Sequence, residues 1–154
     1  NTYSQITIQL VFSVKHREAL VEPKFKNLLE MYITGIIQAY GHKLLAISRM
    51  PDHCHILVGL NPNQSISELV RLIKSNSSKY INEQKFCRKK FGWQNGYGAF
   101  SYSLEAMSNV AAYIENQEEH HRKKAFKMEY IDLLETYDVD YEENYLFDWN
   151  ILPD

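Results

Sequence analysis

The chain has 154 residues, of which 45% are hydrophobic and 23% charged. This balance predicts one globular domain and excludes a disordered or fibrous protein. No apolar run approaches the roughly 20 residues that cross a bilayer, and the two cysteines show no CxxC spacing, so we expect a cytoplasmic protein without a membrane segment.

The net charge of −2 hides a strong asymmetry along the chain. All 17 Lys and Arg lie in residues 1–127, whereas residues 128–154 contain nine acids and no basic side chain. We therefore divide the chain into a basic body, residues 1–127, and an acidic C-terminal tail, residues 128–154, which we expect to be helical at its start. A basic body is typical of proteins that bind polyanions, although a solvated surface gives the same pattern.

The first half of the chain predicts a strand, a helix and two more strands. Residues 5–14 alternate in polarity with the period of a half-buried strand. Residues 23–40 begin with a proline, repeat apolar side chains at helical spacing and are followed by Gly41, which suits a helix end. Residues 43–50 and 53–60 are short apolar runs separated by a Pro-Asp turn, which predicts two adjacent strands.

The second half predicts a helix, a strand and a third helix. Ser65 and Glu68 have the spacing of a capping box that opens a helix through Ile81. Residues 99–103 predict a strand, and residues 104–124 predict a helix that is acidic at its start and basic at its end. The whole order contains the βαββαβ pattern of an α+β, ferredoxin-like fold: an antiparallel sheet with helices on one face and an added C-terminal helix.

The most informative local pattern is a pair of histidines in one predicted strand. His53 and His55 are two residues apart, so both imidazoles face one side of the sheet and Cys54 faces the other. Such a pair is half of a metal site, and the absence of a thiolate on its side distinguishes it from a zinc knuckle. Two polar positions on an exposed strand face would look the same, so the spacing leaves both interpretations open.

Two helices offer side chains that could complete a site with the histidine pair. The third helix carries three such residues at spacings of four, on one face: Tyr113, Gln117 and His121. Tyr80 and Gln84 have the same spacing in the second helix. A solvated helix face explains either set, and spacing alone does not choose between them.

Two segments resemble the HUH single-tyrosine insertion-sequence transposases, a superfamily that includes the REP-associated transposases and acts on single-stranded DNA. Residues 50–58 read MPDHCHILV and resemble the His-hydrophobe-His segment that follows a Met-Pro-Asp turn. Residues 113–123 read YIENQEEHHRK and resemble the nucleophile helix. Residues 69–75 and 96–101 are also similar to family segments. Cys54 departs from the more usual bulky aliphatic residue, but it is a small buried hydrophobe, and we expect no functional change.

This resemblance implies a metal-dependent DNA transposase that cleaves and rejoins single-stranded DNA through a 5′-phosphotyrosine. It implies Tyr113 as the nucleophile and His53, His55 and Gln117 as the metal ligands. Two imidazoles and an amide oxygen without a thiolate favour Mg or Mn, which would neutralise the charge of the phosphodiester. A phenol has an ordinary pKa of about 10, so the nucleophile needs activation.

The resemblance also implies partners. The substrate would be single-stranded DNA with hairpins near the element ends, and the protein would be a homodimer whose active sites are shared in trans. Basic side chains spread through the body are candidates for phosphate contacts, which position DNA without reading its sequence. These candidates are Lys15, Arg17, Arg71, Lys74, Lys79, Arg88, Lys89 and Lys90.

Two other functions compete with this interpretation. The first is a ferredoxin-like nucleic-acid-binding or regulatory module without catalysis, such as a domesticated or decayed transposase. The presence of Tyr113, both histidines and Gln117 argues against decay, because drift has no reason to spare all four. The second is a metal-dependent nuclease that uses water, which would leave no DNA attached to the protein.

Overall fold

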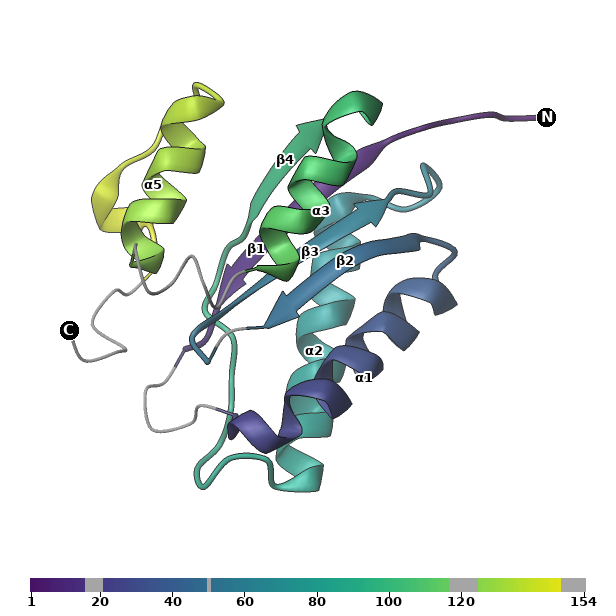
Figure 1. The fold of residues 1–154 in the computed structure, drawn as a ribbon. Helices are drawn as coiled ribbons and strands as arrows, with labels where there is room; N and C mark the ends of the chain where they lie inside the picture. Colours follow the sequence, from purple (N-terminus) through teal and green to yellow (C-terminus); the bar gives the residue numbers. More distant parts are fainter. Residues whose placement is uncertain (16–20, 50, 117–124, 148–154) are drawn as a thin grey trace.

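The computed structural model describes residues 1–15, 21–49, 51–116 and 125–147. Within them, four strands form one sheet in which every neighbouring pair is antiparallel, in the order β2-β3-β1-β4 (Figure 1). The strands are β1 (Thr7–Ser13), β2 (Lys43–Arg49), β3 (His53–Gly59) and β4 (Gly98–Tyr102). β3 lies between β1 and β2, the two strands of the first βαβ unit, and β1 lies between β3 and β4, the two strands of the second. This is the split βαβ arrangement of the ferredoxin-like fold.

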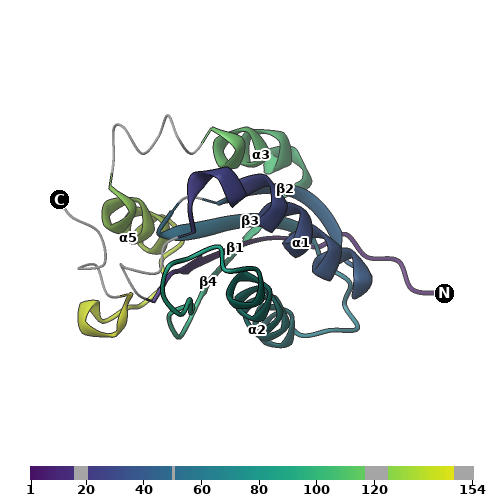
Figure 2. The same cartoon turned by 90° about the horizontal axis from the view of Figure 1, so that it is seen from below.

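Helices cover both faces of this sheet. α1 (Lys26–Ala39) and α2 (Ile66–Gln84) lie side by side on one face, and α3 (Met107–Glu115) packs on the other, against β2 and β3. Figure 2 shows α2 and α3 on opposite sides of the sheet. α5 (Phe126–Thr136) also lies on the α3 side, where its side chains reach β3. Short 3-10 helices occupy Pro23–Phe25, Leu104–Ala106 and Glu143–Tyr145.

The expected element order and fold class are confirmed. Gly41 ends the first helix with a φ of +81°, a conformation that costs other residues a steric penalty. Ser65 caps α2, because its hydroxyl accepts a hydrogen bond of 3.1 Å from the backbone N–H of Glu68. None of the helices in the described ranges has the length and apolar character needed to cross a membrane.

Strand β1 differs from the expectation of a half-buried strand, because all seven of its residues are buried. Leu10 and Phe12 pack into the main core with α1 and α2. The alternate side chains, such as Gln9 and Val11, are also buried, on the face toward α3 and α5. A central strand covered on both sides loses its solvent face, whatever its alternation in sequence suggests.

The third helix is shorter than expected, and the start of the tail is packed. α3 ends at Glu115, with Asn116 as its cap, so the prediction of one helix to residue 124 is wrong; residues 117–124 lie outside the described residues.

The tail begins as the helix α5, as expected, and α5 packs closely against the sheet. A Cβ on Gly98 of β4 would lie 2.9 Å from the Tyr130 ring of α5, so the glycine permits this approach.

Candidate metal and nucleophile site

The histidine pair lies on the central strand β3, on the face toward α3 and α5. His53 and His55 are both fully buried, with rings 5.1 Å apart between centroids. Cys54 points to the other face, into the core formed with α1 and α2, where burial raises the pKa of its thiol to about 12. The interpretation of the histidines as exposed surface residues is therefore wrong, and Cys54 does not face their side.

Each imidazole is oriented by a hydrogen bond at Nδ1. His53 Nδ1 lies 2.7 Å from Oδ1 of Asp52, and His55 Nδ1 lies 2.8 Å from Oε1 of Gln9. Gln9 is itself fixed, since its Nε2 donates to the Tyr102 hydroxyl at 2.7 Å. Because both oxygens act as acceptors, Nδ1 donates in each ring, and Nε2 becomes the atom that can bind a metal.

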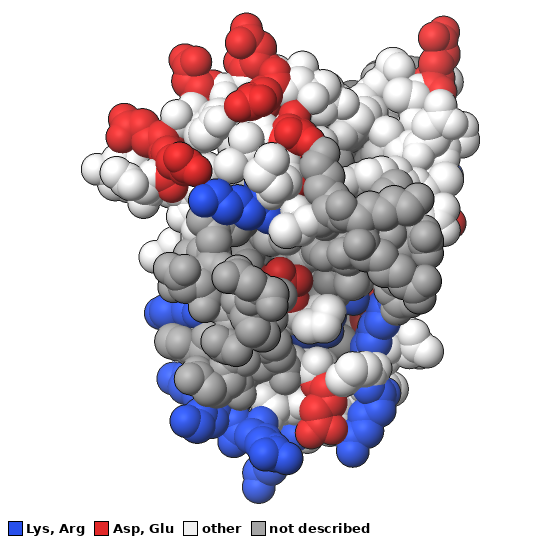
Figure 3. Space-filling view, turned by 60° about the vertical axis from the view of Figure 1, so that its left-hand side comes forward, with Lys and Arg blue, Asp and Glu red and all other residues white. Residues whose placement is uncertain are grey.

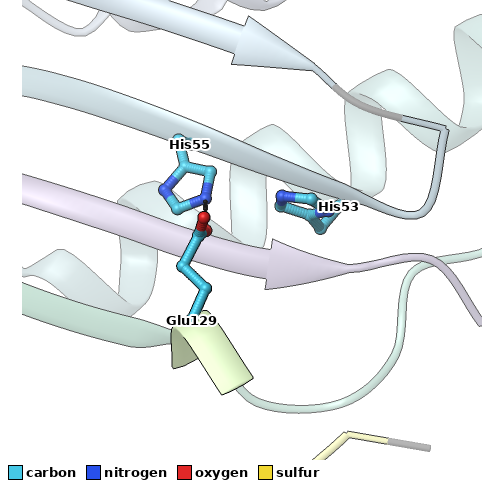
Figure 4. Close-up of side chains that lie close together, drawn as sticks. All are labelled: His53, His55 and Glu129. Atoms are coloured by element: carbon cyan, nitrogen blue, oxygen red, sulfur yellow. Dashed lines mark hydrogen bonds and ion pairs between the residues drawn. The ribbon is translucent and has the colours of Figure 1, made fainter. Parts of the chain in front are cut away.

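A carboxylate from α5 completes a cluster with the two histidines. Glu129 is 3% exposed, and its Oε1 accepts a hydrogen bond of 2.7 Å from His55 Nε2. Burial raises the pKa of Glu129, but the hydrogen bond and electrostatic attraction of His55 outweigh that effect, with a further hydrogen bond from Tyr113, and the pKa of Glu129 falls to about 2. Glu129 is thus an ionised carboxylate that points at the imidazoles (Figure 4).

The donor atoms of this cluster fit a divalent cation. One ligand atom from each of His53, His55 and Glu129 lies within 4.8 Å of the others, and all three residues are buried. Imidazole nitrogens and a carboxylate oxygen suit Mn, Fe, Ni, Co or Zn, and Mg accepts the oxygen. Asp52 and Gln9 accept hydrogen bonds from the Nδ1 atoms and so fix the orientation of the two rings, as is usual for metal-binding histidines.

Tyr113 is brought to the same place by the packing of α3. Apolar side chains of α3, including Ile114, pack on Ala46 and Leu57 of the sheet. One residue before Ile114, the half-buried Tyr113 places its ring 6.2 Å from that of His55, at an angle of 86°. Two elements that are far apart in the sequence therefore present a phenol and an imidazole pair to each other.

The competing tyrosine is on the wrong side of the sheet. Tyr80 belongs to α2, and its ring stacks on that of Tyr32 of α1 at 3.9 Å. These helices cover the face opposite to the histidine pair, so Tyr80 does not reach it. Gln117 and His121 lie outside the described residues, and the assignment of Gln117 as a ligand stays a prediction.

The predicted DNA-binding side chains differ in how far their charge is already paired within the protein. Arg71 pairs with Glu68 at 2.6 Å, and Lys79 lies 3.9 Å from Glu83. Lys74 donates to two backbone carbonyls of the loop before β4, at 2.8 and 2.5 Å, and burial lowers its pKa to about 8. The remaining described candidates are exposed: Lys15, Arg88, Lys89 and Lys90. Arg17 lies outside the described residues.

Charge is segregated on the surface as it is in the sequence. In Figure 3 the Lys and Arg side chains gather at the lower end, where α1 begins and α2 ends, and most acids gather at the upper end. The segment that follows α2 runs along this lower end (Figure 1). A polyanion that approaches the protein would meet a favourable potential there and an unfavourable one at the acidic end.

Sequence reasoning missed three residues of the site. Asp52 directly precedes the histidine pair, and its position in the turn was a usable signal. Gln9 was placed on the second face of the first strand, and only the pairing of β1 with β3 puts it diagonally across from His55. Glu129 is 74 residues from His55 and was counted with the acidic tail, so no local signal identified it.

The support that Gln9 gives to His55 can be tested. Replacing Gln9 by methionine keeps the side-chain volume but removes the acceptor at His55 Nδ1. We expect Mn²⁺ affinity, measured by titration calorimetry, to fall by about 10- to 100-fold. Gln5→Met is the matched control, because Gln5 is exposed. Equal affinities for the folded Gln9→Met variant and the unmodified protein would show that His55 needs no such support.

The fold, and the buried His-x-His pair beside a tyrosine on a helix, agree with the resemblance to the single-tyrosine transposases. Residues 2–117 match the family model described as "Transposase IS200 like". Because this match spans most of the chain, the protein belongs to the IS200-like transposase family.

Individual relatives agree with this family. The chain is 25% identical over 118 residues to the ISDra2 transposase TnpA of Deinococcus radiodurans, covering 73% of this chain and 84% of the relative. The crystal structure of a transposase from the same species superposes with a TM-score of 0.60 at 22% identity, and the match covers 76% of this chain and 94% of the other. The structure of a REP-associated tyrosine transposase bound to a REP hairpin also superposes with a TM-score of 0.60. It is 16% identical and covers 79% of this chain and 72% of the other. At these identities the two solved structures show a shared fold.

Proposed function

We propose that the protein cleaves and rejoins single-stranded DNA, with Tyr113 as the nucleophile and with a divalent ion, Mg or Mn, held by His53 and His55. The observation that carries this proposal is the contact between α3 and β3, which sets the Tyr113 ring 6.2 Å from His55. A bound divalent ion would neutralise charge on the phosphate oxygens and make the phosphorus more electrophilic. The resemblance adds Gln117 as a further ligand.

The reacting groups of the chain account for both steps. The Tyr113 oxygen bonds to phosphorus as the bond to the 3′ oxygen breaks, which gives a 5′-phosphotyrosine and a free 3′-hydroxyl. Glu129 accepts a hydrogen bond from Tyr113, which orients the phenol, and the proton that the phenol loses is balanced by the one that the departing 3′ oxygen gains. In the reverse step a 3′-hydroxyl attacks the phosphotyrosine and the tyrosine leaves, so rejoining needs no ATP.

We propose DNA with a hairpin near the cleavage site as the substrate. The support is the family, together with a relative whose structure was solved with a REP hairpin. The exposed basic residues after α2 offer phosphate contacts at the basic end of the molecule. Cys54 is a free thiol, which agrees with the cytoplasmic location that we propose.

Formation of a covalent adduct tests this function. The purified protein is incubated with Mg²⁺ or Mn²⁺ and a labelled single strand that contains a hairpin, and the products are separated on a denaturing gel. Transfer of a label at the 3′ end of the strand to the protein supports the tyrosine mechanism, because a 5′-phosphotyrosine retains the fragment that carries this end. Cleavage without transfer would instead identify a nuclease that uses water, and binding without cleavage would identify a module without catalysis.

Whether two chains share a site is a separate proposal. The resemblance predicts a homodimer in which the tyrosine of one chain serves the histidines of the other, but within this chain Tyr113 already lies beside His55. We therefore expect a mixture of Tyr113→Phe and His53→Ala proteins to stay inactive. Return of activity after subunits have exchanged, as size measurements would show, would establish sites shared in trans.

A further inference from the structure

The family resemblance ends near the start of α5, so it assigns no role to Glu129, whose carboxylate reaches the histidine pair from this helix. Of the described acids after residue 127, Glu129 alone is buried. A carboxylate away from water is costly unless hydrogen bonds, positive groups or a metal compensate it. Its position therefore needs a reason beyond the solubility that an acidic tail provides.

The contacts of α5 hold Glu129 in place against β3. Phe126, one turn earlier on the helix, stacks on the His53 ring at 3.9 Å with an angle of 9° between the planes. Tyr130, the next residue along, packs at Gly98, where the missing Cβ lets α5 approach β4. With one anchor on each side, the Glu129 carboxylate has little freedom to leave His55, whose Nε2 is 2.7 Å away.

The atom that Glu129 contacts is the one that a metal would use. Both Nδ1 atoms are occupied by Asp52 and Gln9, which leaves Nε2 for coordination. The Glu129 oxygen and one nitrogen from each imidazole lie within 4.8 Å of one another. Figure 4 shows the carboxylate, carried by α5, pointing at the two rings that project from β3.

We propose that Glu129 is the third protein ligand of the divalent ion held by His53 and His55, so that α5 is part of the metal site. This inference rests on the proposed function for the presence of a metal, but not for the role of Tyr113. Two imidazoles and one carboxylate form a set with open positions for phosphate and water. It also gives the segment after the tyrosine helix a role: metal binding ties α5 to the sheet.

Metal binding without DNA tests the proposal. Mn²⁺ is titrated calorimetrically into the full chain and its Glu129→Gln variant, which keeps the volume but removes the charge. We expect the dissociation constant to rise at least about tenfold. The matched control is Glu135→Gln, which removes the same charge from an exposed position on α5 and should bind like the unmodified protein. Unchanged affinity in Glu129→Gln would overturn the proposal.

A Gln117→Ala variant separates the two candidate ligands. Loss of affinity in Glu129→Gln, with or without a loss in Gln117→Ala, supports Glu129 as a ligand. Loss in Gln117→Ala alone would assign the third position to Gln117 and overturn the proposal. The adduct assay is independent: an unmodified protein that binds Mn²⁺ through Glu129 but forms no adduct would refute the proposed function and leave this inference standing.

Crystals of the unmodified chain soaked in Mn²⁺ give a second measurement that does not depend on the folding of a variant. The anomalous signal of the ion should lie between the two histidines, with a Glu129 oxygen at ligating distance. An ion bound to both imidazoles with Glu129 turned away would overturn the proposal, and so would the lack of any ion at the histidines.

Discussion

Replacing Tyr113 by phenylalanine should reduce the covalent DNA adduct by about a hundredfold or more, because it removes the phenolic oxygen that would bond to phosphorus beside His55. DNA binding should change little, since only one hydroxyl is removed. The adduct is measured on a denaturing gel, and binding is measured by fluorescence anisotropy with the same hairpin strand.

Tyr80→Phe is the matched control for this substitution. Tyr80 has the same spacing to a glutamine, but its ring stacks on Tyr32 on the opposite face of the sheet. Its hydroxyl should therefore be dispensable for the adduct. Loss of the adduct in Tyr80→Phe, with full activity in Tyr113→Phe, would show that the nucleophile has been assigned to the wrong helix.

Replacing His55 by alanine should lower metal-dependent cleavage by about a hundredfold or more, because it removes a proposed metal ligand and the hydrogen bond that His55 makes to the buried Glu129. His53→Ala should have a similar effect. Cleavage is measured at saturating DNA over a range of Mn²⁺ concentrations, with thermal unfolding of the metal-free proteins as a check that each variant is folded.

Cys54→Ala distinguishes the loss of a ligand from the loss of packing. Cys54 lies between the two histidines in sequence but is fully buried on the other face, among α1 and α2. We expect this variant to be destabilised by about 1 kcal/mol and to cleave normally. A loss of cleavage equal to that of His55→Ala, with no loss of stability, would point to a thiolate ligand and to zinc.

Local patterns in the sequence determined the elements and the direction of their side chains. The alternation of a strand puts His53 and His55 on one face and Cys54 on the other, because successive residues of any strand point to opposite sides. Gly41 and Ser65 marked helix ends through their own backbone and side-chain chemistry. These features depend on residues a few positions apart, and the structure has them where the sequence predicts.

The tertiary structure decided which elements face the histidines. Tyr80 and Tyr113 are equivalent by spacing, and packing of their helices on opposite faces of the sheet separates them. Gln9 reaches His55 only through the pairing of β1 with β3, and Glu129 only through the docking of α5. Periodicity shows which side of an element is apolar but not which partner will cover it, because that depends on contacts between segments far apart in the chain.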